Sequence, residues 1–113
     1  MHERDGTRVI LAKVLQRANA AGSNRIADVH LVLGEISSYT EESIRSLWDE
    51  VSRGTSAENA KLHFRHVPAE VQCMACFTKY HPANGEIVCP NCRSVGAKIL
   101  AGEEFFMEGL DLA

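Results

Sequence analysis

Four cysteines are the residues whose type and spacing most clearly predict chemistry. They form two pairs, Cys73-Met-Ala-Cys76 and Cys89-Pro-Asn-Cys92, with twelve residues between the pairs. Two residues between cysteines let one turn bring both thiolates of a pair to the same side. Two such turns facing each other complete a tetrahedron around one zinc ion, with Zn–S distances of about 2.3 Å. We therefore predict one structural zinc ion held by all four thiolates, with no open position for a catalytic water.

Disulfides, free core thiols and a redox centre are the alternatives for these cysteines. No apolar run approaches the ~20 residues that span a bilayer, and the first residues do not resemble a secretory signal. These features predict a cytoplasmic protein without a membrane segment. In a reducing cytosol, paired CxxC motifs are more often metal ligands than disulfides, which favours zinc.

The first three residues, Met1-His2-Glu3, offer a second set of metal donors. The amine of Met1, the amide nitrogen of His2 and the His2 imidazole can close adjacent chelate rings, and Glu3 can supply a fourth donor. Four donors in a plane suit Ni(II) or Cu(II) better than zinc. The alternative interpretation is an ordinary frayed terminus.

The composition is that of a small globular protein. The chain has 113 residues, of which 45% are hydrophobic, and its formal net charge is −3. A chain of this length forms one domain, or a small domain with a smaller appendage. The acidic balance argues against a nucleic-acid partner or an anionic membrane.

Hydrophobic periodicity predicts two helices. In the first, over residues 7–21, the apolar residues form one stripe, and Gly22 is placed to end the helix. In the second, over about 39–53, Ile44, Leu47, Trp48 and Val51 recur at helical spacing, and Ser38 with Glu41 has the spacing of a capping box.

Alternating apolar residues predict three strands, over residues 26–33, 60–67 and 104–112. In the first strand Val29, Leu31 and Leu33 share one face, in the second Leu62 and Phe64 point inward, and in the last Phe106, Leu110 and Leu112 share a face.

These elements predict an α+β fold, a small mixed sheet with two helices plus an inserted zinc-ribbon-like subdomain. Residues 1–68 and 102–113 would form an α/β domain that carries the N-terminal donors for Ni(II) or Cu(II), and residues 69–101 the zinc-binding domain. A segment as short as 69–101 cannot bury an adequate core unaided, so it needs the metal.

The other histidines are predicted to have structural positions. His30 lies on the strand face opposite the apolar residues, which favours a polar-face histidine over a ligand. His63 and His66 fall on opposite faces of their strand, so they cannot easily share a metal. His81, between the two cysteine pairs, is predicted to be an exposed loop residue.

The whole chain resembles the HypA/HybF family of hydrogenase nickel-incorporation proteins. The resemblance rests on Met1-His2-Glu3, Gly34-Glu35, the two cysteine pairs and Gly102-Glu103-Glu104, which occur in the family's order. One departure is the stretch Arg4-Asp5-Gly6-Thr7-Arg8, where the family usually has apolar and small residues. Glycine disfavours a helix interior, so we expect the first helix to begin after Gly6.

The resemblance implies a metallochaperone and not an enzyme. It implies that His2 binds nickel with help from Met1 and Glu3, and that Cys73, Cys76, Cys89 and Cys92 bind structural zinc. It also implies that the protein delivers nickel to a [NiFe]-hydrogenase large-subunit precursor and works with a HypB-type GTPase. In some organisms such proteins also work with urease maturation proteins. The alternatives are a zinc-ribbon module that binds nucleic acid or protein, and an enzyme at the zinc.

Overall fold

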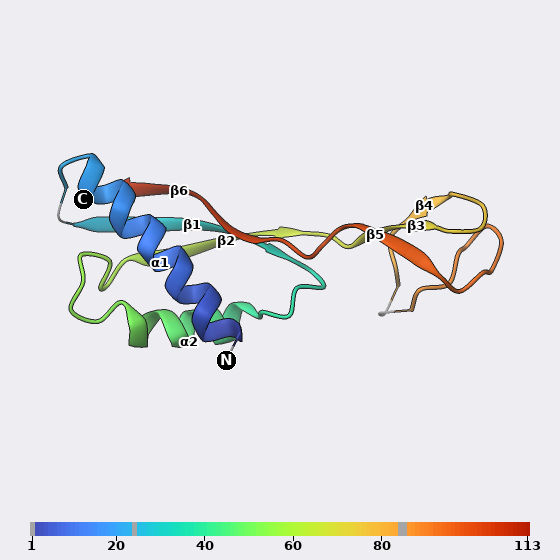
Figure 1. Cartoon of the computed structure of the whole chain (residues 1–113), viewed down its shortest axis with the longest axis horizontal. Coiled ribbons are helices and arrows are strands. Elements are labelled where there is room, and N and C mark those ends of the chain that lie inside the picture. Colours follow the sequence, from blue (N-terminus) through green and yellow to red (C-terminus); the bar gives the residue numbers. More distant parts are fainter. Residues whose placement is uncertain (1, 24, 84–85) are drawn as a thin grey trace.

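The computed structural model describes residues 2–23, 25–83 and 86–113, with side chains from Asp5 onward. The molecule is elongated, with extents of 55 × 25 × 17 Å, because two small sheets lie end to end (Figure 1). In chain order, the elements are α1 (His2–Ala20), β1 (Ile26–Gly34), α2 (Glu41–Val51), β2 (Lys61–Val67), β3 (Glu70–Cys73), β4 (Lys79–Tyr80), β5 (Ala97–Ala101) and β6 (Phe105–Leu112).

The first sheet has the strand order β2-β1-β6 and is mixed. β1 and β2 run parallel, with α2 in the connection between them, and β6 is antiparallel to β1. Parallel neighbours need such a crossover, usually through a helix. The second sheet, β4-β3-β5, is antiparallel and lies between β2 and β6 in the chain. The predicted α+β fold with an inserted zinc-ribbon-like segment is therefore confirmed.

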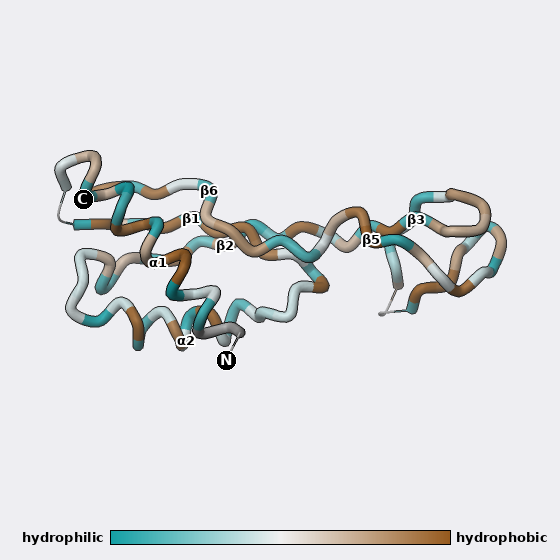
Figure 2. The backbone as a smooth tube through the Cα atoms, viewed as in Figure 1, coloured by the Kyte–Doolittle hydropathy of each residue, from teal (hydrophilic) through white to brown (hydrophobic). Residues whose placement is uncertain are grey.

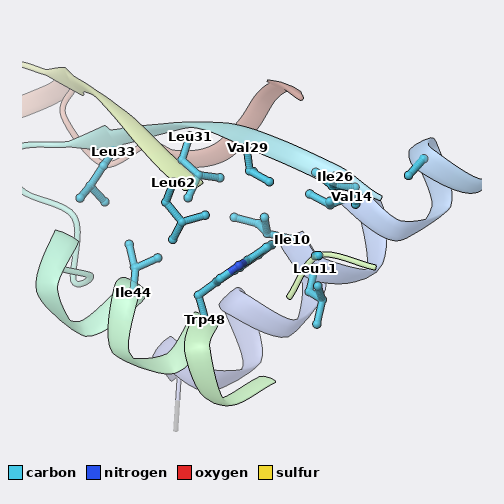
Figure 3. Close-up of a cluster of buried hydrophobic side chains, with 12 residues drawn as sticks. Ile10, Leu11, Val14, Ile26, Val29, Leu31, Leu33, Ile44, Trp48 and Leu62 are labelled. Carbon is cyan, nitrogen blue, oxygen red and sulfur yellow. The ribbon is translucent and has the colours of Figure 1, made fainter. Parts of the chain in front are cut away.

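Both helices bury an apolar face against the same face of the first sheet (Figure 3). Along α1 and β1 hydrophobic and hydrophilic stretches are interspersed, as Figure 2 shows. Each buried aliphatic side chain contributes about 1.5–3 kcal/mol relative to exposure. Trp48 is in this core. The buried residues are Ile10, Leu11, Val14, Ala18, Ile26, Val29, Leu31, Leu33, Ile44, Trp48, Ala57 and Leu62.

Helix α1 begins at His2, so the predicted start after Gly6 is wrong. Packing outweighs the low helix propensity of glycine here. A Cβ built on Gly6 would lie 2.4 Å from the hydroxyl oxygen of Tyr39 and 2.9 Å from its Cζ. Only a residue without a side chain lets Tyr39 lie this close to the helix. The end of α1 follows the prediction, since Gly22 has a φ of 75°.

Helix α2 is capped by residues other than the predicted pair. Thr40 is the N-cap: its Oγ1 accepts from the Ser43 N–H at 3.1 Å, and the Ser43 Oγ accepts from the Thr40 N–H at 3.2 Å. The predicted capping box of Ser38 and Glu41 is therefore wrong. Glu41 lies in the first turn of the helix, where a negative charge suits the positive end of the helix dipole.

In β6, the residues that face the core do not follow one regular alternation along the whole strand. Phe105, Met107 and Leu110 pack against the core, whereas Phe106 is 44% exposed and Leu112 38% exposed. The register between β1 and β6 shifts in the middle of the pair, and one extra residue moves every later side chain to the other face. The predicted shared face of residues 106, 110 and 112 is therefore wrong for Phe106.

The two sheets are joined where the chain passes into and out of the cysteine segment. The Gly34 N–H donates to the carbonyl oxygen of Glu104 at 2.7 Å. The Glu35 Oε1 accepts from the Ala69 N–H at 3.0 Å, and the Glu104 Oε1 accepts from the Gly102 N–H at 2.8 Å. The two carboxylates therefore bind backbone groups of the two connecting segments.

Candidate metal centre

The four cysteine sulfurs form the one group of three or more metal-ligating side chains that converges in the described part of the chain. All four Sγ atoms lie within 4.8 Å of one another. Cys73 and Cys92 are separated by 3.5 Å between sulfurs, and Cys76 and Cys89 by 3.6 Å. A tetrahedral zinc with Zn–S bonds of about 2.3 Å separates its sulfurs by about 3.8 Å. The sulfur cage therefore has the size that one such ion requires.

The first pair of cysteines lies in a tight turn at the end of β3. The Phe77 N–H donates to the carbonyl oxygen of Cys73 at 3.0 Å, and the Cys73 N–H donates to that of Thr78 at 2.9 Å. Phe77 has a φ of 64°, a left-handed conformation that few large residues adopt. This turn directs the sulfurs of Cys73 and Cys76 to the same side.

The second pair repeats the turn. The Arg93 N–H donates to the carbonyl oxygen of Cys89 at 2.9 Å, and the Cys89 N–H donates to that of Ser94 at 3.0 Å. Arg93 has a φ of 67°, which is close to that of Phe77 at the equivalent position of the first turn. Two equivalent turns from separate parts of the chain thus face each other.

Hydroxyl groups next to the sulfurs favour the thiolate form. The Thr78 hydroxyl lies 3.2 Å from the Cys76 sulfur and, with the Asn91 amide at 3.5 Å, lowers the pKa of Cys76 to about 5. The Ser94 hydroxyl lies 3.2 Å from the Cys92 sulfur and lowers the pKa of Cys92. These two sulfurs can therefore bind a cation near neutral pH without a large cost of deprotonation.

The sequence interpretation overlooked Thr78 and Ser94. A signal was available, because each hydroxyl residue follows the second cysteine of its pair by two positions. That repetition is visible without a structure and extends each motif to Cys-x-x-Cys-x-Thr/Ser.

The other two sulfurs, of Cys73 and Cys89, are fully buried. The Cys76 N–H points at the Cys73 sulfur at 3.5 Å, and the Cys92 N–H at the Cys89 sulfur at 3.4 Å. This N–H of Cys92 lowers the pKa of Cys89, but burial and the contacts with neighbouring thiols outweigh it and raise that pKa. Losing its proton is therefore unfavourable for Cys89 alone, and a dication bound to its thiolate would offset that penalty.

Four sulfur donors fit zinc in type and number. Thiolates select zinc over hard cations, and a shell of four thiolates is closed, with no position for a water ligand. Tyr80 packs beside the cage, and burial followed by the nearby cysteine charges raises the pKa of its hydroxyl. The arrangement supports a structural ion and offers no catalytic site.

The predicted nickel donors lie at the start of α1. His2 is the first residue of this helix, and Glu3 follows in its first turn. Met1 lies outside the described residues, as do the side chains of His2 and Glu3. The first N–H groups of an α-helix have no acceptor within the helix, so the amide nitrogens of His2 and Glu3 take no part in its hydrogen bonds.

The structure places His66 and His81 outside the cage. His66 lies on the helix-facing side of β2, where its Nε2 is 2.9 Å from a carboxylate oxygen of Glu41. His81 is exposed, as predicted, and its Nδ1 lies 2.7 Å from the carbonyl oxygen of Ala69. Neither belongs to the converging donor group.

Among the residues that the structure describes, no helix is long and apolar enough to cross a membrane.

Comparisons with known proteins identify the family. The family described as "Hydrogenase/urease nickel incorporation, metallochaperone, hypA" matches residues 1–112. The hydrogenase maturation factor HypA of Dehalococcoides mccartyi is 33% identical over 112 residues, covering 99% of this chain and 94% of the relative. That of Geotalea daltonii is 38% identical over 90 residues, covering 80% and 82% of the two chains.

The fold is also that of a solved structure. The solution structure of the Ni metallochaperone HypA from Helicobacter pylori superposes with a TM-score of 0.67 at 20% identity, covering 97% of this chain and 96% of the other. The whole-chain family match, the relatives and the paired-cysteine architecture agree. The chain belongs to the HypA family of nickel metallochaperones for hydrogenase maturation, and is a maturation factor and not an enzyme.

Proposed function

We propose that this protein binds Ni(II) at its N-terminus and hands it to a [NiFe]-hydrogenase precursor. The donors are the amine of Met1, the amide nitrogen and imidazole of His2, and Glu3 in an assisting role. The observation that carries the proposal is the family match over residues 1–112, which includes Met1-His2-Glu3.

The position of these residues in the fold supports this donor set. Because α1 begins at His2, the amide nitrogens of His2 and Glu3 are not needed for helix hydrogen bonds. An amide that loses its proton on binding nickel becomes negative, and the positive end of the helix dipole favours negative charge there. Nickel held in this way exchanges its ligands more readily than an ion in a closed sulfur cage.

The cysteine cage has a different role in this proposal. It holds Zn2+ permanently and stabilises the segment 69–101 as a zinc-binding domain, while residues 1–68 and 102–113 form the nickel-binding domain. The second sheet has a small buried cluster of Val71, Cys73, Tyr80 and Cys89, which is too little apolar burial to fold alone. Zinc supplies the missing stabilisation.

The partners follow from the same proposal. Nickel transfer takes place in the cytoplasm, with a HypB-type GTPase and the hydrogenase large-subunit precursor, and urease maturation proteins are further acceptors. Transfer is a ligand exchange, in which donors of the acceptor replace the imidazole of His2 and the amine of Met1.

Nickel titration of three forms of the zinc-bound, untagged protein tests the proposal. These are the natural chain, His2→Ala, and a chain with two residues added before Met1. We expect the natural chain to bind one more nickel than the other two at low concentration. A matched control, His81→Ala, removes one histidine elsewhere and should bind as the natural chain does. Equal nickel binding by the natural, His2→Ala and extended chains would contradict the proposal.

A further inference from the structure

Two histidines and two aspartates gather on the outer face of the first sheet, the face opposite the helices. Val29 and Leu31 of β1 point toward the helices (Figure 3). Alternate residues of a strand point to opposite faces, so Asp28 and His30 lie on the outer face.

The strand register brings the other two residues beside them. His63 of β2 is the cross-strand partner of His30, and Asp111 of β6 is the partner of Asp28. We name Asp28, His30, His63 and Asp111 the outer-face cluster. It contains four side chains of types that bind metal ions, and none of them belongs to the sulfur cage.

The four side chains interact as two diagonal pairs. His30 Nε2 lies 2.8 Å from a carboxylate oxygen of Asp111, and His63 Nε2 lies 2.7 Å from one of Asp28. The two imidazole rings stack with centroids 5.0 Å apart and planes 21° apart. All four side chains reach solvent, with exposed fractions of 39%, 61%, 48% and 28% for His30, Asp111, His63 and Asp28.

The outer-face cluster has more negative than positive charge around it. Asp28 and Asp111 are neighbours across two strands, and like charges at such positions destabilise a sheet. Lys61 is the partner of Asp28 on its other side. The nearby cation Arg65 is engaged with Glu108 at 3.1 Å. With neutral imidazoles, the cluster therefore presents two carboxylates to one flanking lysine, and a divalent cation would neutralise them.

We propose that the outer-face cluster is a second, exchangeable binding site for a divalent first-row transition ion such as Ni(II), Co(II) or Zn(II). The ion replaces the two His–Asp hydrogen bonds, with the Nε2 atoms of His30 and His63 and the carboxylates of Asp28 and Asp111 as ligands. Two imidazoles with two carboxylates form a donor set that suits these ions better than magnesium or calcium.

The backbone already provides the necessary spacing. Two nitrogen ligands at about 2.1 Å from one ion lie about 3.0 Å apart in an octahedral site and about 3.4 Å apart in a tetrahedral one. Strand neighbours stand about 4.8 Å apart, and the imidazoles of His30 and His63 face each other at this spacing. The donors now form two pairs and do not converge on one point, so the side chains must rotate when the ion binds. Because all four are partly exposed, rotation disturbs no buried packing, and we expect weaker binding than at the sulfur cage.

The test uses zinc-bound protein with two residues added before Met1, which removes the N-terminal chelate and leaves the outer-face cluster intact. Co(II) is added during calorimetry and during NMR of the histidine rings. We expect one ion to bind and the ring signals of His30 and His63 to broaden together, ahead of His66 and His81. The visible absorption of cobalt thiolate must stay absent, which shows that zinc remains in the cage.

Two double variants of the extended chain decide the assignment. The variant His30→Asn/His63→Asn should weaken Co(II) binding by at least the roughly tenfold that loss of a supporting group causes at metal sites. The matched control, His66→Asn/His81→Asn, removes as many histidines and should bind as its parent does. Equal affinity of the two variants overturns the proposal, as does broadening of other histidine signals first.

The histidine ring signals are measured on the extended chain without any substitution, so this result tests the proposal even where a variant fails to fold. The result is also separate from that of the N-terminal site. Loss of nickel binding on extending the chain tests the chelate of Met1 and His2, whereas Co(II) binding by the extended chain tests only the outer face.

Discussion

Gly34 and Gly102 lie so close that a Cβ built on Gly34 would lie 2.0 Å from the carbonyl oxygen of Gly102. That same oxygen accepts the N–H of Ile36 at 2.8 Å. The end of β1 thus crosses the chain as it returns from the cysteine segment, with backbone directly against backbone. The motifs Gly34-Glu35 and Gly102-Glu103-Glu104 therefore form one structural unit, the junction between the two sheets.

We predict that Gly34→Ala destabilises the protein. The added methyl group meets backbone and not a flexible side chain, so the junction must move, and forced overpacking costs about 1–3 kcal/mol. Urea unfolding should show this loss in the free energy of unfolding. Gly109→Ala is the matched control, because nothing lies within 4 Å of a Cβ built there. Equal stability of the two variants would show that the junction adapts freely.

A second prediction concerns the carboxylate of Glu35. It accepts the backbone N–H of Ala69, a residue that is 1% exposed. Glu35→Ala leaves this buried donor without a partner, which costs about 1–3 kcal/mol. Glu35→Gln keeps an acceptor oxygen and should restore most of the loss. Glu58→Ala, at an exposed position, controls for the removal of a negative charge. Thermal unfolding of the four proteins makes the comparison, and a glutamine variant as unstable as the alanine variant would refute this role.

How much could be predicted from the sequence depends on the range of the interactions. The cage was predictable because each Cys-x-x-Cys turn is local, and helix and strand types followed from periodicity. The start of α1 could not be predicted, because Gly6 is accommodated by Tyr39, more than thirty residues away. The face of Phe106 depends on a register shift between two distant strands. The outer-face cluster likewise required the strand register. The nickel ligands remain a prediction.

The third prediction uses the hydroxyl of Thr78. This group is the main cause that lowers the pKa of Cys76 to about 5. In Thr78→Val the pKa of Cys76 rises, so the thiolate is lost at a higher pH as the solution is acidified. In zinc-free, reduced protein, the alkylation rate of Cys76 should therefore have a midpoint at higher pH than in the natural chain. In zinc-bound protein, zinc release should begin at a higher pH, because protons compete better for that sulfur.

Ser94→Ala provides the reciprocal control. Its hydroxyl acts first on Cys92, so this variant should raise the alkylation midpoint of Cys92 and leave that of Cys76 nearly unchanged. Mass spectrometry of the alkylated peptides separates the two sites. Identical profiles for both variants would mean that the hydroxyls do not set thiolate formation.

Metal removal provides the fourth prediction. A strong chelator under reducing conditions should unfold the second sheet and leave the first sheet folded. The second sheet has only a small buried cluster, whereas twelve of the described residues, including Trp48, form the core that the first sheet shares with the helices. Hydrogen exchange should show lost protection at Val71 and Gln72 and retained protection at Leu31. Persistent protection of β3 without metal would show that the segment folds without zinc.

The fifth prediction tests why α1 extends back to His2. Gly6→Ala should destabilise the first turns of this helix, because the new methyl group collides with the ring of Tyr39. In a chain that already carries Tyr39→Ala the collision is absent. There, Gly6→Ala should become favourable by up to about 1 kcal/mol, the difference in helix propensity between the two residues. The effect of one substitution thus changes sign with the other.

A double-mutant cycle measures this coupling through the free energies of unfolding of the four proteins. Nickel affinity of the same proteins then connects packing with the N-terminus. If a well-formed first turn positions the amides of His2 and Glu3, Gly6→Ala alone should weaken nickel binding, and addition of Tyr39→Ala should restore it. If the stability changes while the nickel affinity remains constant, nickel binding does not depend on how well the first turn of the helix is formed.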